Sequence, residues 1–191
     1  SMLSFTPLRG KNVTSMNRRI TKDMARNAAN KMSLDLYASK ISAAEEELIR
    51  FADDCIKQSL PMPVLQVIEE FKEYFSYTTN VVISDGNGHT IYAKSTIKVP
   101  ATYYYIYVKD VMYEQGKRLY LEKQRLSDKK KAFADETTYL LYQELKFEKK
   151  VAEVAPEILS YIDFPEVVAP PSRTLYYDQL NNLLKNIKKL K

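Results

Sequence analysis

One long segment without helix-breaking residues limits the fold more than any other feature of the sequence. Residues 109–147 contain no proline and a single glycine, Gly116, which lies near the start. Since proline and glycine are the poorest residues in a helix interior, this segment predicts one long helix over about residues 109–147. Apolar residues recur in it every seven positions, at Leu119, Leu126, Phe133, Leu140 and Phe147.

The apolar stripe of this helix is narrow. The positions midway between its members are polar, whereas a dimeric coiled coil needs apolar residues at both positions of the heptad. We therefore expect the helix to pack on its own domain near both ends, while the charged middle, from Lys123 to Lys131, lies in solvent. A break at Ser127 that makes a helical hairpin is the alternative.

Helical patterns also occur upstream. Thr21 is a suitable N-cap, and apolar residues then recur at helical spacing. Ser42 and Glu45 have the spacing of a capping box, which predicts that a second helix begins there and runs to about Gln58. Pro63 suits the first turn of a third helix, because the N–H that proline lacks is unpaired at that position anyway.

The periodicity changes between residues 80 and 100. Two apolar runs flank the sequence Asp85-Gly-Asn-Gly88, and glycine and asparagine tolerate the positive φ of tight turns, so a β-hairpin is expected at about residues 80–100. Residues 103–108 are either a third strand or a tyrosine-rich loop. A lone hairpin is marginally stable in water and must pack on the helices. The expected fold class is α+β and mostly helical, with helices packed on a small antiparallel hairpin or three-stranded sheet and one long charged helix.

The ends of the chain differ from this central region. Residues 1–15 have no helical or alternating period, so we expect a flexible N-terminal arm followed by a single α+β domain over residues 16–191. Apolar residues at helical spacing predict a C-terminal helix at about residues 176–190, which either joins the core or contacts another copy. We expect a monomer or a small homo-oligomer. No apolar run is long enough for a signal peptide or a membrane span, which favours a cytoplasmic location.

The composition leaves little room for catalysis. One cysteine and one histidine are too few for a disulfide framework or a cysteine-built zinc site. Cys55 lies on the apolar stripe of its predicted helix and should be buried and unreactive, whereas His89 follows a turn and should be exposed. The Gly-containing turn matches neither a calcium loop nor a dinucleotide loop. We therefore expect no catalytic residues, no cofactor and no metal site.

Charge is unevenly distributed along the chain. Residues 1–40 carry eight basic and two acidic side chains, and residues 41–80 carry three basic and eight acidic ones, within a net charge of +5. Such segments commonly are solvated faces or pair with each other. The alternative is contact with a nucleic-acid phosphate backbone. The basic residues predicted for that contact are Arg18, Arg19, Arg26, Lys129, Lys130 and Lys131.

Tyrosine is the unusual residue, with fifteen copies and no tryptophan. Tyrosine is large and rigid and has a polar tip, so it suits a helix–sheet seam, a protein interface or base stacking. Four tyrosines lie together beside the predicted hairpin. The predicted protein-binding residues are Tyr103, Tyr104, Tyr105 and Tyr107.

The order of these segments also resembles a phage family. The relevant stretches are RRITKDMARNAANKM, NVVISDGNGHTIYAKSTIKVP, EQGKRLYLEKQRLSDKKKAFADETTYLLYQEL and VAEVAPEILSYIDFP. Over about residues 16–165 their order is similar to that of the phage nucleotide-modification-associated domain family, the fifth of its series. Members often carry a Trp-Pro-Glu step where this chain has Ala155-Pro-Glu157.

The resemblance implies a phage origin and supplies no catalytic motif. Together with the residues, it leads us to expect a non-enzymatic phage accessory protein in the host cytoplasm. This protein would bind a host or anti-phage defence protein as an inhibitor or adaptor. The alternative is a nucleic-acid-binding protein associated with phage DNA metabolism or base modification.

Overall fold

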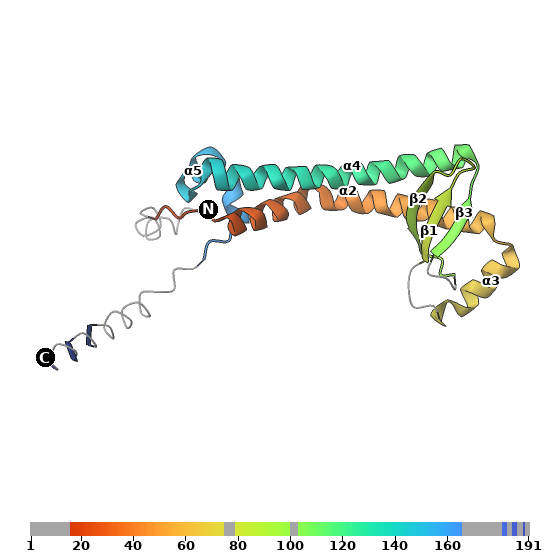
Figure 1. Cartoon of the computed structure of the whole chain (residues 1–191), viewed down its shortest axis with the longest axis horizontal. Helices are drawn as coiled ribbons and strands as arrows, with labels where there is room; N and C mark the ends of the chain where they lie inside the picture. Colours follow the sequence, from red (N-terminus) through yellow and green to blue (C-terminus); the bar gives the residue numbers. More distant parts are fainter. Residues whose placement is uncertain are drawn as a thin grey trace, which may run out of the picture.

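The computed structural model describes residues 16–74, 79–99 and 103–165, together with helical positions 181–182, 185–186 and 189. The predicted N-terminal arm and most of the predicted C-terminal helix lie outside the described residues. Two long helices, α2 (Lys22–Ser59) and α4 (Asp110–Tyr139), run antiparallel side by side, with a small sheet at one end and α5 (Glu148–Val154) at the other (Figure 1). The mostly helical α+β class is confirmed.

Helix α2 begins as the sequence predicts but continues further. The Thr21 side chain accepts a hydrogen bond from the Met24 amide at 3.2 Å, as an N-cap should. The predicted break at Ser42 is wrong, because α2 passes through it without interruption. Glu45 forms an ion pair with Lys123 of α4, and no proline or glycine interrupts α2, so packing on α4 extends the helix past the capping pattern.

Helix α4 is continuous through Ser127, so the alternative of a helical hairpin is wrong. It passes into a π-helical turn, η2 (Leu140–Leu145), which ends at Lys146 with a φ of 68°. The helix therefore stops close to the predicted end. Its stripe packs on α2 in the middle of the helix as well as near the ends, since mid-helix Leu126 is buried and the Phe133 ring lies 6.2 Å from that of Tyr37.

The sheet contains β1 (Thr79–Ser84), β2 (Thr90–Ser95) and β3 (Tyr103–Tyr107), in the order β2-β1-β3. β1 and β2 form the predicted antiparallel hairpin, and the third strand is also present. The prediction of an antiparallel sheet is wrong for β3, which pairs parallel to β1. Because β2 runs back to the end at which β1 begins, β3 starts at that same end and runs parallel to β1.

The hairpin turn is built around one carboxylate. Asp85 accepts hydrogen bonds from the amides of Asn87 and His89, each at 2.9 Å, and Gly88 has a φ of 82°. Gly88 therefore adopts the positive φ that the Gly-containing sequence predicted for this turn. In the sequence, α3 (Met62–Phe71) and the 3-10 turn η1 (Lys72–Tyr74) lie between α2 and the sheet, and a further 3-10 turn, η3 (Pro156–Tyr161), follows α5.

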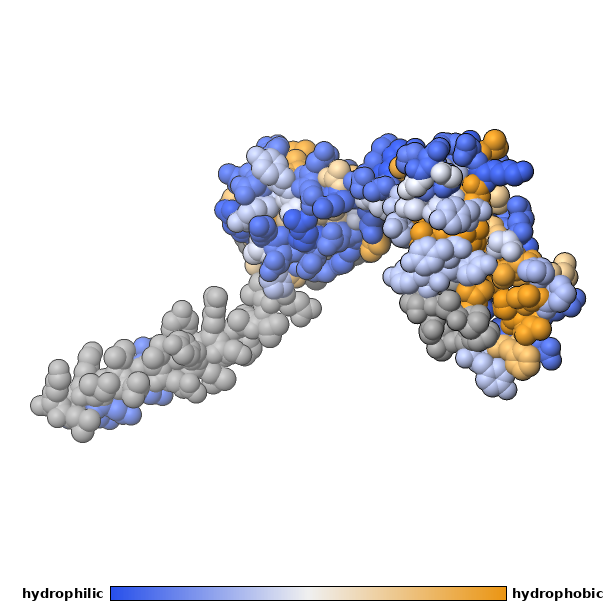
Figure 2. Space-filling view, turned by 45° about the vertical axis from the view of Figure 1, so that its right-hand side comes forward, coloured by the Kyte–Doolittle hydropathy of each residue, from blue (hydrophilic) through white to orange (hydrophobic). Residues whose placement is uncertain are grey.

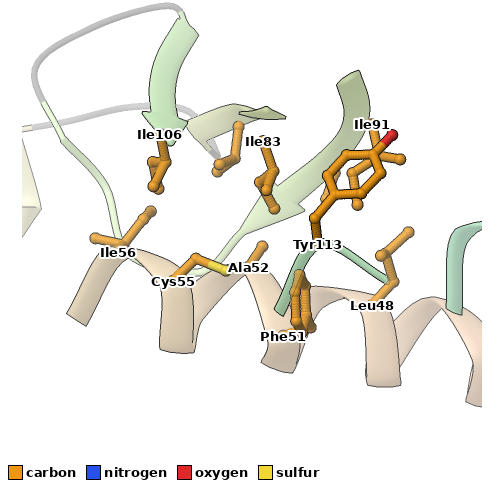
Figure 3. Close-up of a cluster of buried hydrophobic side chains, with 11 residues drawn as sticks. Leu48, Phe51, Ala52, Cys55, Ile56, Ile83, Ile91, Ile106 and Tyr113 are labelled. Carbon is orange, nitrogen blue, oxygen red and sulfur yellow. The ribbon is translucent and has the colours of Figure 1, made fainter. Parts of the chain in front are cut away.

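Each end of the helix pair has its own core. At the sheet end, α2 supplies Phe51, Cys55 and Ile56, against which Ile83 of β1 and Ile106 of β3 pack (Figure 3). At the far end, a second cluster joins the start of the chain to η2, α5 and η3. Its fully buried members are Ile20, Ala25, Ala28, Leu141 and Val151. The first core covers only the inner face of the sheet.

Candidate protein-binding face of the sheet

Alternation along the strands divides the sheet into two faces. In β2, Ile91, Ala93 and Ser95 are buried against the helices, while the residues between them are exposed. In β3, Ile106 points inward in the same way. The helices therefore take one face of the sheet and leave the opposite face to solvent.

Four tyrosines occupy that outer face, and we call them the tyrosine face: Tyr92, Tyr103, Tyr105 and Tyr107. They are 58%, 52%, 69% and 80% exposed, respectively. Val82 of β1 lies between them, with Tyr92 and Tyr105 as its cross-strand neighbours, and is only 5% exposed. No described element packs over these rings. The outer face is therefore a surface of exposed aromatic side chains around one shielded apolar residue.

Helix α3 extends the apolar surface at this end of the molecule. Val64, Val67, Phe71 and Tyr74 are spaced three or four residues apart, and all four are exposed. The rings of Phe71 and Tyr74 lie 6.1 Å apart. We call these four residues the α3 stripe. In Figure 2, hydrophobic residues gather at the sheet end, whereas the opposite end is mostly hydrophilic.

The structure divides the predicted protein-binding tyrosines. Tyr103, Tyr105 and Tyr107 belong to the tyrosine face, but Tyr104 does not, because strand alternation turns it toward the first core. Its hydroxyl lies 3.4 Å from the Ser59 hydroxyl. Tyr92 was not among the predicted residues, although the alternating pattern of residues 90–95 and the short hairpin turn place it opposite Val82.

The arginines predicted for nucleic-acid contact have protein partners. Arg18 donates hydrogen bonds to both carboxylate oxygens of Glu148, at 3.1 and 2.6 Å, and its guanidinium lies 4.2 Å from the centre of the Phe164 ring. Hydrogen bonding to Glu148 raises the pKa of Arg18, and the same contact lowers the pKa of Glu148. Arg26 donates to Asp135 at 2.8 Å. These arginines connect segments that are distant in the sequence.

The remaining predicted basic residues are divided between the far end and α4. The Arg19 guanidinium lies 5.5 Å from the Phe147 ring. Lys129 and Lys131 are exposed on α4 and Lys130 is partly so, and none of the three forms a salt bridge within the described residues. The six residues therefore do not form one free basic surface. The Lys123–Glu45 and Arg26–Asp135 pairs support the simpler interpretation that oppositely charged segments face each other.

The groups with intrinsic reactivity are engaged in the fold. Burial raises the pKa of the Cys55 thiol to about 11, with a further contribution from the nearby charge of Asp54. Cys55 is thus buried, as predicted, and its raised pKa agrees with the predicted lack of reactivity. His89 is exposed as predicted, and its Nδ1 lies 2.9 Å from the Asp85 carboxylate that organises the turn. Within the described residues, no three or more His, Cys, Asp or Glu side chains are grouped so that they could hold a metal ion.

A cavity of about 680 Å³ opens between α2, α3 and residues 96–98. Of its two acidic residues, Asp53 and Glu69, Asp53 accepts hydrogen bonds from the Thr96 amide at 2.8 Å and from the Ser95 hydroxyl. This carboxylate therefore closes the end of β2 on α2. The position of Asp53 is therefore explained by its structural hydrogen bonds, without a catalytic role.

None of the described helices is both long enough and apolar enough to span a membrane. Comparison of the chain with protein-family models, with curated proteins and with solved structures found no match in any of the three. The tyrosine face and the α3 stripe are therefore the observations on which a function for this chain rests.

Proposed function

We propose that this chain is a non-enzymatic binding protein that engages a partner protein through the tyrosine face. The observation that carries the proposal is the group of four exposed tyrosines on a sheet face that no described element covers. Tyrosine loses little conformational entropy when it is bound and buries a large area, and it is enriched in the energetically dominant parts of protein interfaces.

The available area fits this role. A fully buried aromatic side chain removes about 150–250 Å² from water, so four tyrosines exposed by half to four-fifths offer on the order of 500 Å². A stable protein interface buries about 800 Å² on each partner. The α3 stripe lies at the same end of the molecule and supplies further apolar area. The largest apolar patch on a typical monomer measures about 300–600 Å² and is often functional, and larger patches mark interaction sites.

The partner class follows from the resemblance to the phage family. It indicates a host or anti-phage defence protein, which this chain would bind in the cytoplasm as an inhibitor or adaptor. The surroundings of the tyrosine face agree with a protein surface, because Lys94 is the one charged side chain among the described residues on the outer side of the three strands. Nucleic-acid binding is the competing outcome, and it is disfavoured because Arg18 and Arg26 are paired with acids.

The experiment is an affinity capture from cell lysate, with and without nuclease, read by mass spectrometry. A variant with Tyr92→Thr and Tyr107→Thr removes two rings and keeps residues with high strand propensity. Tyr139→Ala is the matched control, because Tyr139 is 59% exposed on α4 at the far end.

We expect one stoichiometric protein with the wild type and with Tyr139→Ala, regardless of nuclease, and its loss with the double variant. Capture that disappears after nuclease would indicate nucleic-acid binding instead. Capture that survives in the double variant would refute the tyrosine face as the binding site.

A further inference from the structure

Strand β3 is an edge whose outer hydrogen-bonding groups are unused. The Val108 amide donates to the Ser84 carbonyl at 2.9 Å, so Val108 faces β1. Backbone groups alternate in direction along a strand, and hence the N–H and C=O groups of Tyr103, Tyr105 and Tyr107 point away from β1. Within the described part of the chain, none of these groups takes part in a hydrogen bond with another segment.

A groove lies where the next strand would run. It has a volume of about 510 Å³ and opens beside Ile106, between the end of α2 and the start of α4. Figure 1 shows α2 continuing past β3 toward α3. Neighbouring strands are about 4.8 Å apart, so a fourth strand would lie above the part of α2 that extends beyond the sheet. The groove-lining residues of α2 and α4 that would receive its inward side chains are Gln58, Ser59, Val111, Met112 and Gln115.

The two edges of the sheet differ in how they are protected. β2 carries Lys94, and a charged residue is a common means of preventing unwanted strand pairing at an edge. β3 reads Tyr-Tyr-Tyr-Ile-Tyr and contains no charge and no proline. The unprotected edge is therefore the one beside the groove.

We infer that an extended segment of the partner protein adds to β3 as a fourth strand. This inference rests on the proposed function, and it specifies the backbone conformation in which the partner binds. The groove selects uncharged side chains at alternate positions of that segment, because nine of its ten lining residues are uncharged. The charged one, Lys109, follows β3 and forms no salt bridge within the described residues. Lys109 favours an acidic residue in the partner segment at this end, because it lines the groove, whereas Asp110 in the first turn of α4 does not.

Two variants at one position separate the backbone contact from the side-chain contact. Tyr105→Thr removes the ring and keeps the outward N–H, whereas Tyr105→Pro removes both. Because this N–H points away from β1, proline there leaves the pairing of β1 with β3 intact, and proline is tolerated on strand edges for this reason. Circular dichroism checks that both variants fold.

The probe is a displayed library of random peptides of about 12 residues, selected on the wild-type protein. We expect enriched peptides with alternate apolar residues and an acidic residue, and at least tenfold weaker binding to Tyr105→Pro than to Tyr105→Thr. We also expect their binding to slow amide exchange at Tyr103, Tyr105 and Tyr107, a result that requires no variant.

The inference is overturned if no peptide is enriched, if both variants bind equally, or if protection falls on other amides. Tyr92→Thr distinguishes this failure from that of the proposed function, because Tyr92 lies on the tyrosine face but on the opposite edge strand. If the two Tyr105 variants bind equally and Tyr92→Thr loses binding, strand addition is refuted and the tyrosine face is kept as the binding site. If Tyr105→Pro loses binding and Tyr92→Thr has no effect on it, strand addition is kept and the tyrosine face is refuted as the binding site.

Discussion

Gly116 allows α4 to approach the first core, and its replacement by alanine is expected to destabilise the protein. The glycine is buried on the side of α4 that faces α2 and β2. A Cβ added there would lie 2.4 Å from Cε2 of Phe51 and 2.7 Å from Cδ1 of Ile91. Both separations are too short for carbon atoms, and both contacted side chains are themselves buried in the first core.

Two effects of opposite sign determine the outcome of Gly116→Ala. Alanine is favoured over glycine in a helix interior by about 1 kcal/mol. Overpacking a well-filled core costs about 1–3 kcal/mol. The cost here should be near the upper value, since Phe51 and Ile91 come from different elements and both must move. The expected net loss in the free energy of unfolding is about 1–2 kcal/mol, which lowers Tm by about 2–8 °C in a chain of this size.

Thermal and urea unfolding followed by circular dichroism measure this change. Ser127→Ala is the control, because Ser127 is exposed on the same helix and should respond to helix propensity alone with a small gain in stability. Phe51→Leu should make Gly116→Ala less costly in a double-mutant cycle, since it removes the ring that the new methyl group meets. An unchanged or higher Tm in Gly116→Ala would refute the proposed close approach.

Two further predictions concern titratable groups. The Arg18 hydrogen bond lowers the pKa of Glu148 in the folded state below its ordinary value of 4.5. The pair therefore stabilises the fold fully at pH values above 4.5, and this contribution is lost as the pH falls from 4.5 through the pKa of the folded state. Glu148→Gln should therefore show a smaller loss of stability between pH 7 and about pH 3.5 than the wild type, and an equal loss in urea titrations at the two pH values would contradict this. Cys55 should resist a thiol reagent at pH 8 in the native protein and react once the protein is unfolded, because its pKa is raised to about 11; rapid native reaction would show that the thiol is accessible.

Local patterns predicted the elements that depend on local physics. Thr21 caps α2, the Gly-containing turn closes the hairpin, and the segment after Lys109 forms one long helix because each depends on neighbours in the sequence. The capping pattern at Ser42 failed for the complementary reason. Packing of α2 on α4 along its length outweighs a cap worth about 1 kcal/mol.

The candidate site was only partly predictable, since it depends on how distant segments meet. The cluster of tyrosines after residue 102 is evident in the sequence. The inward position of Tyr104 follows only once residues 103–107 are known to form a strand. Tyr92 joins the face only through the pairing of β2 with β1. In the same way, nothing near Arg18 in the sequence shows its structural role, because its partner Glu148 lies 130 positions away.

The most direct test of the tyrosine face is the affinity of the captured partner, measured by titration calorimetry for the wild type, Tyr92→Thr, Tyr107→Thr and Tyr139→Ala. Truncation of an interface tyrosine at a binding hot spot costs about 2 kcal/mol or more. We therefore expect a Kd at least tenfold higher for each face variant. Tyr139→Ala should match the wild type. Equal Kd values for all four proteins would contradict the assignment of the tyrosine face as the binding surface.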